Sequence, residues 1–240
     1  MVKVVAHRGF SAKYPENTIR AFRAALDLDV DMVEFDVHLT QDEEPVIIHD
    51  ATVDRTSNGR GRVEGMTLAQ IQALDAGSWL SPDFAGERIP TLSAVLDLLG
   101  GRVRLNIHLK AYASTRAVLV PRVIDELAQR QLFEECFIAS DEETLKRAKQ
   151  TRSELAICNL STKPLETYIA RSRAIGCHIL QPGNRQVTPQ LVEEAHSYAM
   201  EVNPFYADDT DEMRRLIGCG VDGILTNRPD VLVQVRAGKL

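Results

Sequence analysis

Residues 31–37, DMVEFDV, alternate apolar side chains with the carboxylates Glu34 and Asp36, a pattern that predicts a strand. Seven other short runs rich in Val, Ile and Leu resemble it, and segments with helical spacing of apolar residues separate them. Eight such alternating units predict an α/β fold, a (β/α)8 TIM barrel. In chain order the runs are VKVVAH, DMVEFDV, RLNIHLK, CFIAS, LAICNL, CHILQPG, MEVNPFY and VDGILT.

One segment interrupts this alternation. Residues 37–90 separate the second strand from its helix, which is far more than an ordinary βα loop needs. The segment opens with HLTQDEEPVIIHD, two strand-like runs around a short polar turn, which indicates a hairpin. We expect Thr40 to pair with Pro45, a register that also sets His49 opposite Asp36. The remainder is expected to form a small cap, so the 240 residues constitute one domain with an insertion.

Composition limits the functions that the chain can have. With 240 residues, 44% of them apolar, it can bury one substantial core. No apolar run reaches about 18 residues, so we expect no stable membrane insertion. The first residues lack the features of a signal peptide, and the four scattered cysteines suit free thiols, so we expect a cytoplasmic protein. The net charge of −6 argues against a nucleic-acid partner, and no pattern indicates an oligomeric state.

Ionisable side chains gather at the ends of the first three predicted strands. Active sites of (β/α)8 barrels form where the carboxyl ends of the strands meet. Residues two apart in a strand point to the same face of the sheet. Glu34 and Asp36 therefore share a face of the second strand, and His108 and Lys110 share a face of the third. Singly, each residue is more often a partner in a local hydrogen bond; together they indicate chemistry. They are His7 and Arg8, Glu34 and Asp36, His49 in the hairpin, and His108 and Lys110.

These residue types suit phosphoester cleavage. Glu34 and Asp36, buried together, would repel each other and raise a carboxyl pKa unless a hard divalent cation lay between them. Histidines beside that cation can act as general acid and general base. Arg8 and Lys110 supply the local positive charge that a phosphate needs in an acidic protein. The set predicts metal-assisted cleavage of a small-molecule phosphodiester.

Four stretches of the chain carry a family resemblance: HRGFSAKYPENTIRAF, VEFDVHLTQDEEPVIIHDATVDRTSNGRG, IPTL and GVDGILTNRPD. They closely resemble the bacterial, cytoplasmic type of the glycerophosphodiester phosphodiesterase family. The resemblance implies a metal-dependent (β/α)8-barrel hydrolase that converts glycerophosphodiesters to an alcohol and sn-glycerol 3-phosphate, usually with Mg²⁺ or Ca²⁺. It also implies attack by the neighbouring glycerol hydroxyl, with two histidines moving protons, and a cyclic phosphate that water opens.

The resemblance also implies roles for individual residues. Two histidines match the catalytic pair, two carboxylates match metal ligands, and two basic residues match contacts of the substrate phosphate. An aromatic residue falls where the family often has Trp and is expected to form an apolar wall beside the glycerol. The catalytic pair is His7 and His49, and the metal ligands are Glu34 and Asp36. The phosphate contacts are Arg8 and Lys110, and the aromatic residue is Phe205.

Neighbouring polar residues are expected to support the site. Glu16 and Asn17, in PENT, match a motif at the base of the site, and anchoring the first loop and capping its helix explains them as well as substrate contact does. Arg55 is expected to organise the cap. His38 points away from Asp36 by strand alternation and is given no role.

The chain departs from the family at LNIHLK, where relatives usually read LNIEIK and the Glu is the third metal carboxylate. Three interpretations are open for His108. As a neutral imidazole ligand it would shift preference from Mg²⁺ and Ca²⁺ toward Mn²⁺, Co²⁺ or Zn²⁺. As an additional cation it would bind phosphate and leave the metal to two carboxylates. In the third interpretation the barrel has lost catalysis and kept a phosphate-binding pocket. We favour the first.

Another enzyme class competes with this prediction. A related phospholipase-like barrel would act on lysophospholipid or sphingolipid head groups. Such a protein is expected to expose an apolar or basic patch for the lipid surface. An aromatic content of 5% and an acidic balance argue against that alternative.

Overall fold

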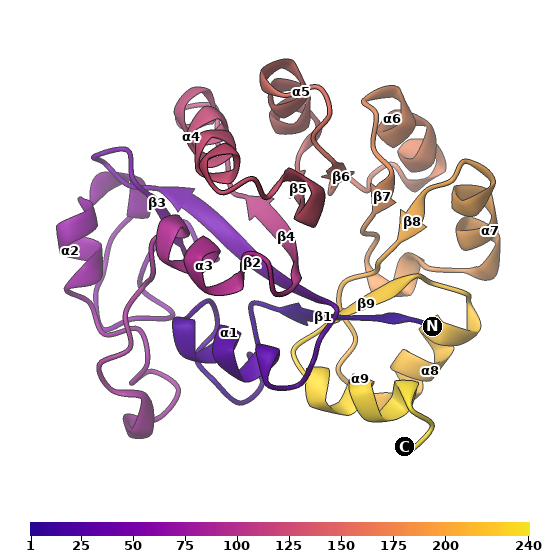
Figure 1. Ribbon diagram of the computed structural model, residues 1–240, viewed down its shortest axis with the longest axis horizontal. Coiled ribbons are helices and arrows are strands. Elements are labelled where there is room, and N and C mark those ends of the chain that lie inside the picture. Colours follow the sequence, from indigo (N-terminus) through magenta and orange to yellow (C-terminus); the bar gives the residue numbers. More distant parts are fainter.

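The computed structural model describes residues 1–240 and shows eight parallel strands in a ring with helices around the outside (Figure 1). Hydrogen-bonded neighbours follow the order β8-β7-β6-β5-β4-β2-β1-β9, and β3 pairs with β2 outside this ring. The predicted (β/α)8 barrel is therefore confirmed. Its strands are β1 (Lys3–His7), β2 (Met32–Leu39), β4 (Arg104–Leu109), β5 (Cys136–Ser140), β6 (Ile157–Asn159), β7 (Ile179–Leu180), β8 (Glu201–Val202) and β9 (Gly223–Thr226), with β3 (Pro45–Ile47) beside them.

Hydrogen bonds between β8 and β9 bring the ends of the sheet together. The Asp222 N–H donates to the Val202 carbonyl at 3.0 Å, and the Leu225 N–H donates to the Pro204 carbonyl at 3.0 Å. A Cβ at Gly223 would lie 2.7 Å from Oδ1 of the buried Asn203, so this close approach requires glycine. This closure brings the loop after β9 next to the loop after β1.

All helices except α2 pack their apolar sides against the outer face of the barrel, and most begin at a side-chain cap. Thr188, for example, accepts a hydrogen bond from the Leu191 N–H at 3.2 Å, and Asp141 accepts from the N–H groups of residues 143 and 144 at 3.0 Å. The helices are α1 (Ile19–Leu26), α2 (Leu68–Gln72), α3 (Leu92–Leu99), α4 (Arg116–Gln129), α5 (Glu142–Thr151), α6 (Tyr168–Ala174), α7 (Pro189–Ser197), α8 (Thr210–Gly218) and α9 (Pro229–Arg236). None of them has the length and apolar character needed to span a membrane.

The two faces of the strands carry different side chains. A cluster of 49 buried residues fills the space between strands and helices, and a separate cluster of seven includes Val5 and Met32. Because side chains two apart share a face, His7 lies on the same face as Val5, and Glu34 on the same face as Met32. The inner face therefore changes from apolar to ionisable toward the carboxyl ends of the strands.

The insertion lies between β2 and α3, as predicted, and contains one short helix, α2, which lies beyond the barrel beside β3 (Figure 1). Two 3-10 turns, Val63–Gly65 and Pro82–Phe84, complete it. A third apolar cluster, which includes Val53 and Ile71, gives the insertion a small core of its own.

The predicted hairpin forms, but its predicted register is wrong by one residue. Leu39, not Thr40, lies opposite Pro45, so the residue that faces Asp36 is Ile48, whose N–H donates to the Asp36 carbonyl at 3.1 Å. His49 is consequently one residue beyond the position that we expected.

The turn of the hairpin explains the shift. Thr40 belongs to the turn: its N–H donates to the Glu44 carbonyl at 3.0 Å, and its carbonyl accepts from the Glu43 N–H at 3.1 Å. Glu43 adopts a φ of +61°, the left-handed conformation that a tight turn demands. With Thr40 bonded to Glu44, residues 41–43 form the loop, one residue fewer than in the expected register, which shifts the pairing by one.

Candidate active site

A cavity of about 360 Å³ opens at the carboxyl ends of the barrel strands. All eight residues that the sequence predicted for the site line it, so the fold brings them together, while their roles remain predictions. Four further residues add apolar surface, an amide and a phenol. The predicted residues are His7, Arg8, Glu34, Asp36, His49, His108, Lys110 and Phe205, and the others are Leu160, Gln181, Tyr206 and Leu225.

Asp36, 1% exposed, is surrounded by hydrogen-bond donors and positive charge. Its Oδ1 lies 3.1 Å from both His108 Nδ1 and Lys110 Nζ. Its Oδ2 accepts from Asn17 Nδ2 at 3.0 Å and lies 3.3 Å from Arg8 Nε. Burial alone would raise the pKa of Asp36, but the hydrogen bond from His108 and the charges of Lys110 and Arg8 together hold it well below its usual value. Asp36 is therefore ionised.

Asn17 differs from our expectation of a helix cap. The cap of α1 is Thr18, whose hydroxyl accepts from the Ala21 N–H at 3.2 Å. Asn17 adopts a φ of +58° and donates its backbone N–H to the Arg8 carbonyl at 3.0 Å. This geometry turns its amide onto Asp36, so Asn17 positions a carboxylate of the cavity.

Glu34, 3% exposed, has no Lys or Arg side chain as partner. Its Oε2 accepts from the Arg8 N–H at 3.0 Å and lies 3.9 Å from His7 Nε2. Burial first, and then the negative charge of Asp36, raises the pKa of Glu34 to about 8. This carboxylate needs a nearby cation to remain ionised at neutral pH.

The donor set fits one divalent cation. Glu34, Asp36 and His108 each offer a ligand atom, and these atoms lie within 4.8 Å of one another. Register explains the arrangement, since Asp36 and His108 are direct neighbours on β2 and β4. Two carboxylates with one imidazole form an oxygen–nitrogen set, and a cation there would relieve the uncompensated charge of Glu34.

His7 lies at the end of β1 with an amide behind it. Its Nδ1 is 2.8 Å from Asn227 Oδ1, and its ring stacks on Tyr206 with centroids 5.4 Å apart. Burial, together with the positive charge of Arg8, lowers the pKa of His7 to about 4. His7 is therefore neutral at physiological pH. As a neutral ring it can accept a proton at whichever nitrogen carries no hydrogen.

His49 has a carboxylate behind it instead. Its Nδ1 lies 2.6 Å from Asp50 Oδ1, so the carboxylate accepts the hydrogen that Nδ1 carries and orients the ring. Its backbone carbonyl lies 3.0 Å from Nε2 of the buried His38. His38, to which we gave no role, therefore anchors the strand that presents His49.

A chain of ion pairs joins the insertion to the barrel. Arg55 donates from Nε to Asp50 Oδ2 at 2.8 Å and makes two hydrogen bonds to Glu16, at 2.9 and 2.8 Å. Glu16 also accepts from Arg8 at 2.9 Å. The hydrogen bond from Arg55 is the main cause that lowers the pKa of Asp50. Arg55 thus organises the insertion, as expected, and also anchors the partner of His49.

Three side chains that contact the rings of His7 and His49 were not given a role from the sequence. Asp50 and Asn227 stand inside stretches that carry the family resemblance, HD and TNRPD, but neither stretch indicates which side chain they contact. Tyr206 follows Phe205 in a strand-like run, and no spacing rule predicts its stacking on His7.

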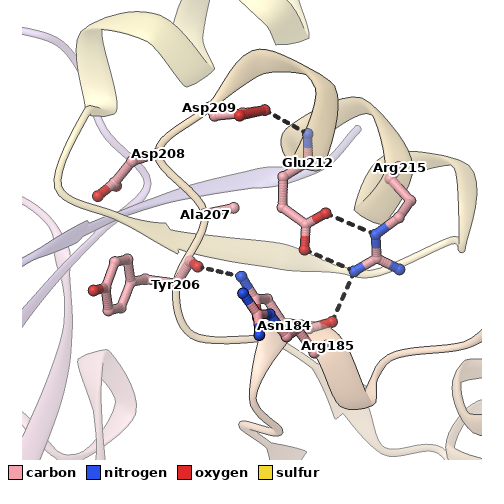
Figure 2. A pocket seen from close by; sticks show the side chains of 8 residues that line it. All are labelled: Asn184, Arg185, Tyr206, Ala207, Asp208, Asp209, Glu212 and Arg215. Atoms are coloured by element: carbon pink, nitrogen blue, oxygen red, sulfur yellow. Dashed lines mark hydrogen bonds and ion pairs between the residues drawn. The ribbon is translucent and has the colours of Figure 1, made fainter.

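A second cavity, of about 550 Å³, adjoins the first, and Tyr206 lines both. Figure 2 shows it between the loop after β8, the start of α8 and the turn before α7. Arg215 crosses it, donating to Glu212 at 2.8 Å and to the Asn184 carbonyl at 2.8 Å. Its surface is polar and charged, with residues Asn184, Arg185, Tyr206, Ala207, Asp208, Asp209, Glu212 and Arg215.

The sequence of residues 7–231 matches the model of the glycerophosphoryl diester phosphodiesterase family. The chain belongs to this family. Among curated proteins, the glycerophosphodiester phosphodiesterase of Caldanaerobacter subterraneus is 38% identical over 238 residues, which cover 98% of each chain. One from Bacillus subtilis is 29% identical over 264 residues, covering 99% of this chain and 87% of the relative. The predicted family and enzyme class are thereby confirmed.

Solved structures of this phosphodiesterase family superpose closely on the barrel. The Oleispira antarctica phosphodiesterase, in complex with the product sn-glycerol 3-phosphate, gives a TM-score of 0.93 at 27% identity and covers 98% of this chain and 96% of its own. The glycerophosphodiester phosphodiesterase of Agrobacterium tumefaciens gives 0.87 at 29% identity, covering 97% and 99%.

Proposed function

We propose that this phosphodiesterase hydrolyses glycerophosphodiesters to an alcohol and sn-glycerol 3-phosphate, using two histidines and one divalent cation. The observation that carries the proposal is one cavity holding two buried carboxylates, two separately supported histidines, and the basic side chains of Arg8 and Lys110. The Oleispira relative, which binds sn-glycerol 3-phosphate, supports the substrate class.

The substrate phosphate would lie between Arg8 and Lys110, since both basic groups border the cavity and also hold Asp36. The glycerol would pack on the apolar wall of Phe205, Leu160 and Leu225. In the first step the glycerol hydroxyl next to the ester oxygen attacks phosphorus, the bond from phosphorus to the leaving alcohol breaks, and a cyclic phosphate forms.

His7 suits the base of this first step. Asn227 presents its amide oxygen to Nδ1, so Nδ1 carries the hydrogen and the Nε2 lone pair is free to take the hydroxyl proton. Burial keeps the ring neutral before the proton arrives. The buried carboxylate of Glu34, 3.9 Å from Nε2, would stabilise the imidazolium once it forms.

His49 suits the acid of the same step. The Asp50 carboxylate, 2.6 Å from Nδ1, stabilises an imidazolium whose Nε2–H can protonate the departing alkoxide. In the second step the roles reverse: water attacks phosphorus while neutral His49 takes its proton. The bond from phosphorus to the glycerol oxygen that attacked first breaks, and the charged His7 returns its proton to that oxygen. The two steps together consume one water and restore both histidines.

A divalent cation held by Glu34, Asp36 and His108 would offset charge on the phosphate oxygens and acidify the attacking hydroxyl. Because His108 contributes nitrogen where relatives usually supply a carboxylate, we propose a preference for Mn²⁺, Co²⁺ or Zn²⁺ over Mg²⁺ and Ca²⁺. The loss of one negative ligand also predicts weaker binding of the hard cations.

The second cavity argues against lysophospholipid as substrate. Glycerol on the apolar wall would direct a further substituent past Tyr206, where Arg185, Asp208 and the Glu212–Arg215 ion pair lie. An acyl chain there would remove charged groups from water without compensation, which is costly. The arrangement favours small, water-soluble diesters.

Four free cysteines, of which three are buried, suit a reducing compartment, and we propose a cytoplasmic location on that basis. Cell fractionation with a compartment-specific alkylating reagent would test it. Alkylation of the protein's cysteines by a reagent that does not cross the cytoplasmic membrane would contradict this location.

The reaction is tested by measuring sn-glycerol 3-phosphate release from glycerophosphocholine and glycerophosphoethanolamine. The protein would be stripped of metal and titrated with Mg²⁺, Ca²⁺, Mn²⁺, Co²⁺ and Zn²⁺. We expect turnover, with the highest activity in a transition metal, and loss of turnover in His7→Ala and His49→Ala. Ligand binding without turnover in every metal would instead support the non-catalytic barrel, and full turnover in either variant would refute the acid–base assignment.

A further inference from the structure

Hydrogen bonds through Asn227 link the carboxylate of Asp208 to His7, the proposed base. We propose that Asp208 is a positioning residue that sets the tautomer of His7 through the side-chain amide of Asn227. The inference rests on the proposed function, in which His7 must accept a proton at Nε2. It concerns the hydrogen on the ring, so it can be tested apart from turnover.

Asp208 makes three hydrogen bonds, all with the end of β9 and the loop after it. Its Oδ1 accepts from the Asn227 N–H at 2.8 Å and from the Thr226 hydroxyl at 3.0 Å. Its Oδ2 accepts from Asn227 Nδ2 at 2.7 Å. Asp208 forms no ion pair with a basic side chain, so these neutral donors are its partners.

The carboxylate decides which way the Asn227 amide points. An ionised carboxylate can only accept, so the NH₂ group of Asn227 must face Asp208. The amide oxygen then faces His7 Nδ1 at 2.8 Å, and an oxygen acceptor requires a hydrogen on that nitrogen. Nδ1–H leaves Nε2 with the lone pair. A rotated amide would set two acceptor oxygens against each other at Asp208 and offer an N–H to His7 Nδ1.

No other partner of Asn227 fixes the amide in this way. The Ser11 hydroxyl oxygen lies 2.8 Å from Asn227 Oδ1 and 2.8 Å from the His7 carbonyl oxygen, and its single hydrogen can be donated to only one of them, so it can accept from or donate to the amide. The Asn227 carbonyl, which accepts from the Ala12 N–H at 3.0 Å, holds the backbone and not the side chain. The orientation of the amide therefore depends on Asp208.

The adjacent Asp209 provides a matched control. Figure 2 shows the two side chains diverging: Asp208 points away from the Glu212–Arg215 pair, and Asp209 turns toward the start of α8. Asp209 accepts from the N–H groups of Asp211 and Glu212 at 2.9 Å each, which caps that helix. Both carboxylates line the same cavity, so a general change of its charge would affect them alike.

The decisive experiment compares Asp208→Asn with Asp209→Asn in the full-length protein. ¹⁵N-histidine NMR of the metal-free protein reports which nitrogen of neutral His7 carries hydrogen. In Asp208→Asn the Asn227 backbone N–H holds the carboxamide oxygen at the place of Oδ1, so the NH₂ group faces the Asn227 side chain and favours the rotated amide. We therefore expect the Nε2–H tautomer of His7 to predominate in Asp208→Asn. We expect a single Nδ1–H tautomer in the parent and in Asp209→Asn. With glycerophosphocholine, kcat should fall about tenfold or more in Asp208→Asn with KM little changed, because the wrong tautomer cannot act as base.

Asp208→Ala, which removes the acceptor without supplying a donor, is expected to give a mixture of both His7 tautomers. An unchanged Nδ1–H tautomer in folded Asp208→Asn or Asp208→Ala overturns the relay. Equal loss of kcat in the Asp208→Asn and Asp209→Asn variants also overturns it, because a purely structural effect would explain both. If His7→Ala keeps full turnover, the proposed function is wrong. The His7 tautomer in the Asp208 variants then still tests whether Asp208 acts on His7 through Asn227.

Discussion

Replacing Asp50 by Asn tests which histidine protonates the leaving group. The carboxylate lies 2.6 Å from His49 Nδ1, and the isosteric amide keeps a hydrogen-bond acceptor but removes the negative charge that stabilises the imidazolium. Arg55 loses a charged partner at the same time but keeps its two hydrogen bonds to Glu16. The substitution therefore acts mainly on His49, the proposed acid.

The size of the effect follows from the loss of a charge-assisted hydrogen bond. Hydrogen bonds to charged groups contribute about 1.5–3 kcal/mol, and about 1.4 kcal/mol corresponds to a factor of ten in rate. The Asp50 side chain is 29% exposed, so solvent screens part of its charge and the lower end of that range applies. We expect kcat on glycerophosphocholine to fall about tenfold.

The assay compares two leaving groups. Choline departs as an alkoxide that needs a proton, whereas a nitrophenolate departs without one. If His49 is the acid of the first step, Asp50→Asn slows release of choline far more than release of nitrophenolate from the corresponding glycerol diester. Arg55→Gln serves as control for the loosened insertion. Equal losses on both substrates, or no loss on either, would refute the assignment of His49.

Three further substitutions test the proposed metal site and the buried His38. His108→Glu should bind Mg²⁺ and Ca²⁺ about tenfold more tightly by calorimetry, because a third carboxylate joins the donor set; unchanged affinity would place His108 outside it. Glu34→Ala should abolish measurable binding of Mn²⁺, and intact affinity would mean that the cation lies elsewhere. Burial lowers the pKa of His38 to about 4, so below pH 6.5 the unfolded state takes up its proton first and stability falls as the pH approaches 4. His38→Gln should reduce the slope of the free energy of unfolding against pH, measured with urea between pH 6.5 and 4, by up to about 1.4 kcal/mol per pH unit. His196→Gln, at the surface, is the control.

The alternation of side chains made much of this site predictable. A period of two fixes that Glu34 and Asp36 share a face, and that His108 and Lys110 do, wherever the strands lie in space. The carboxyl ends of barrel strands meet at one rim, so the pairs had to converge. The predicted hairpin register was wrong because register depends on the turn, where Thr40 bonds to Glu44 and not to Pro45. Turn geometry is set by such local hydrogen bonds, which a pattern of polar residues does not reveal.

Contacts made by closure of the barrel could not be predicted in the same way. His7 and Asn227 are 220 positions apart, and they meet because β9 returns beside β1. Asp208 and Asn227 lie 19 positions apart on successive strand–helix units, each in a loop whose path depends on the helices around it. No periodicity links these residues, so only the folded geometry shows which side chain supports which histidine.

The two histidines are alike in sequence and differ through what lies behind them. A neutral amide oxygen holds His7 Nδ1, and burial disfavours the charged ring, so the resting His7 is an acceptor. A carboxylate, that of Asp50, holds His49 Nδ1 instead. In the proposed reaction one ring takes a proton while the other gives one, and two identical backing groups would not separate these roles. The asymmetry therefore supports the proposed direction of the first step, in which the hydroxyl proton would leave toward His7 and the leaving group would take its proton from His49.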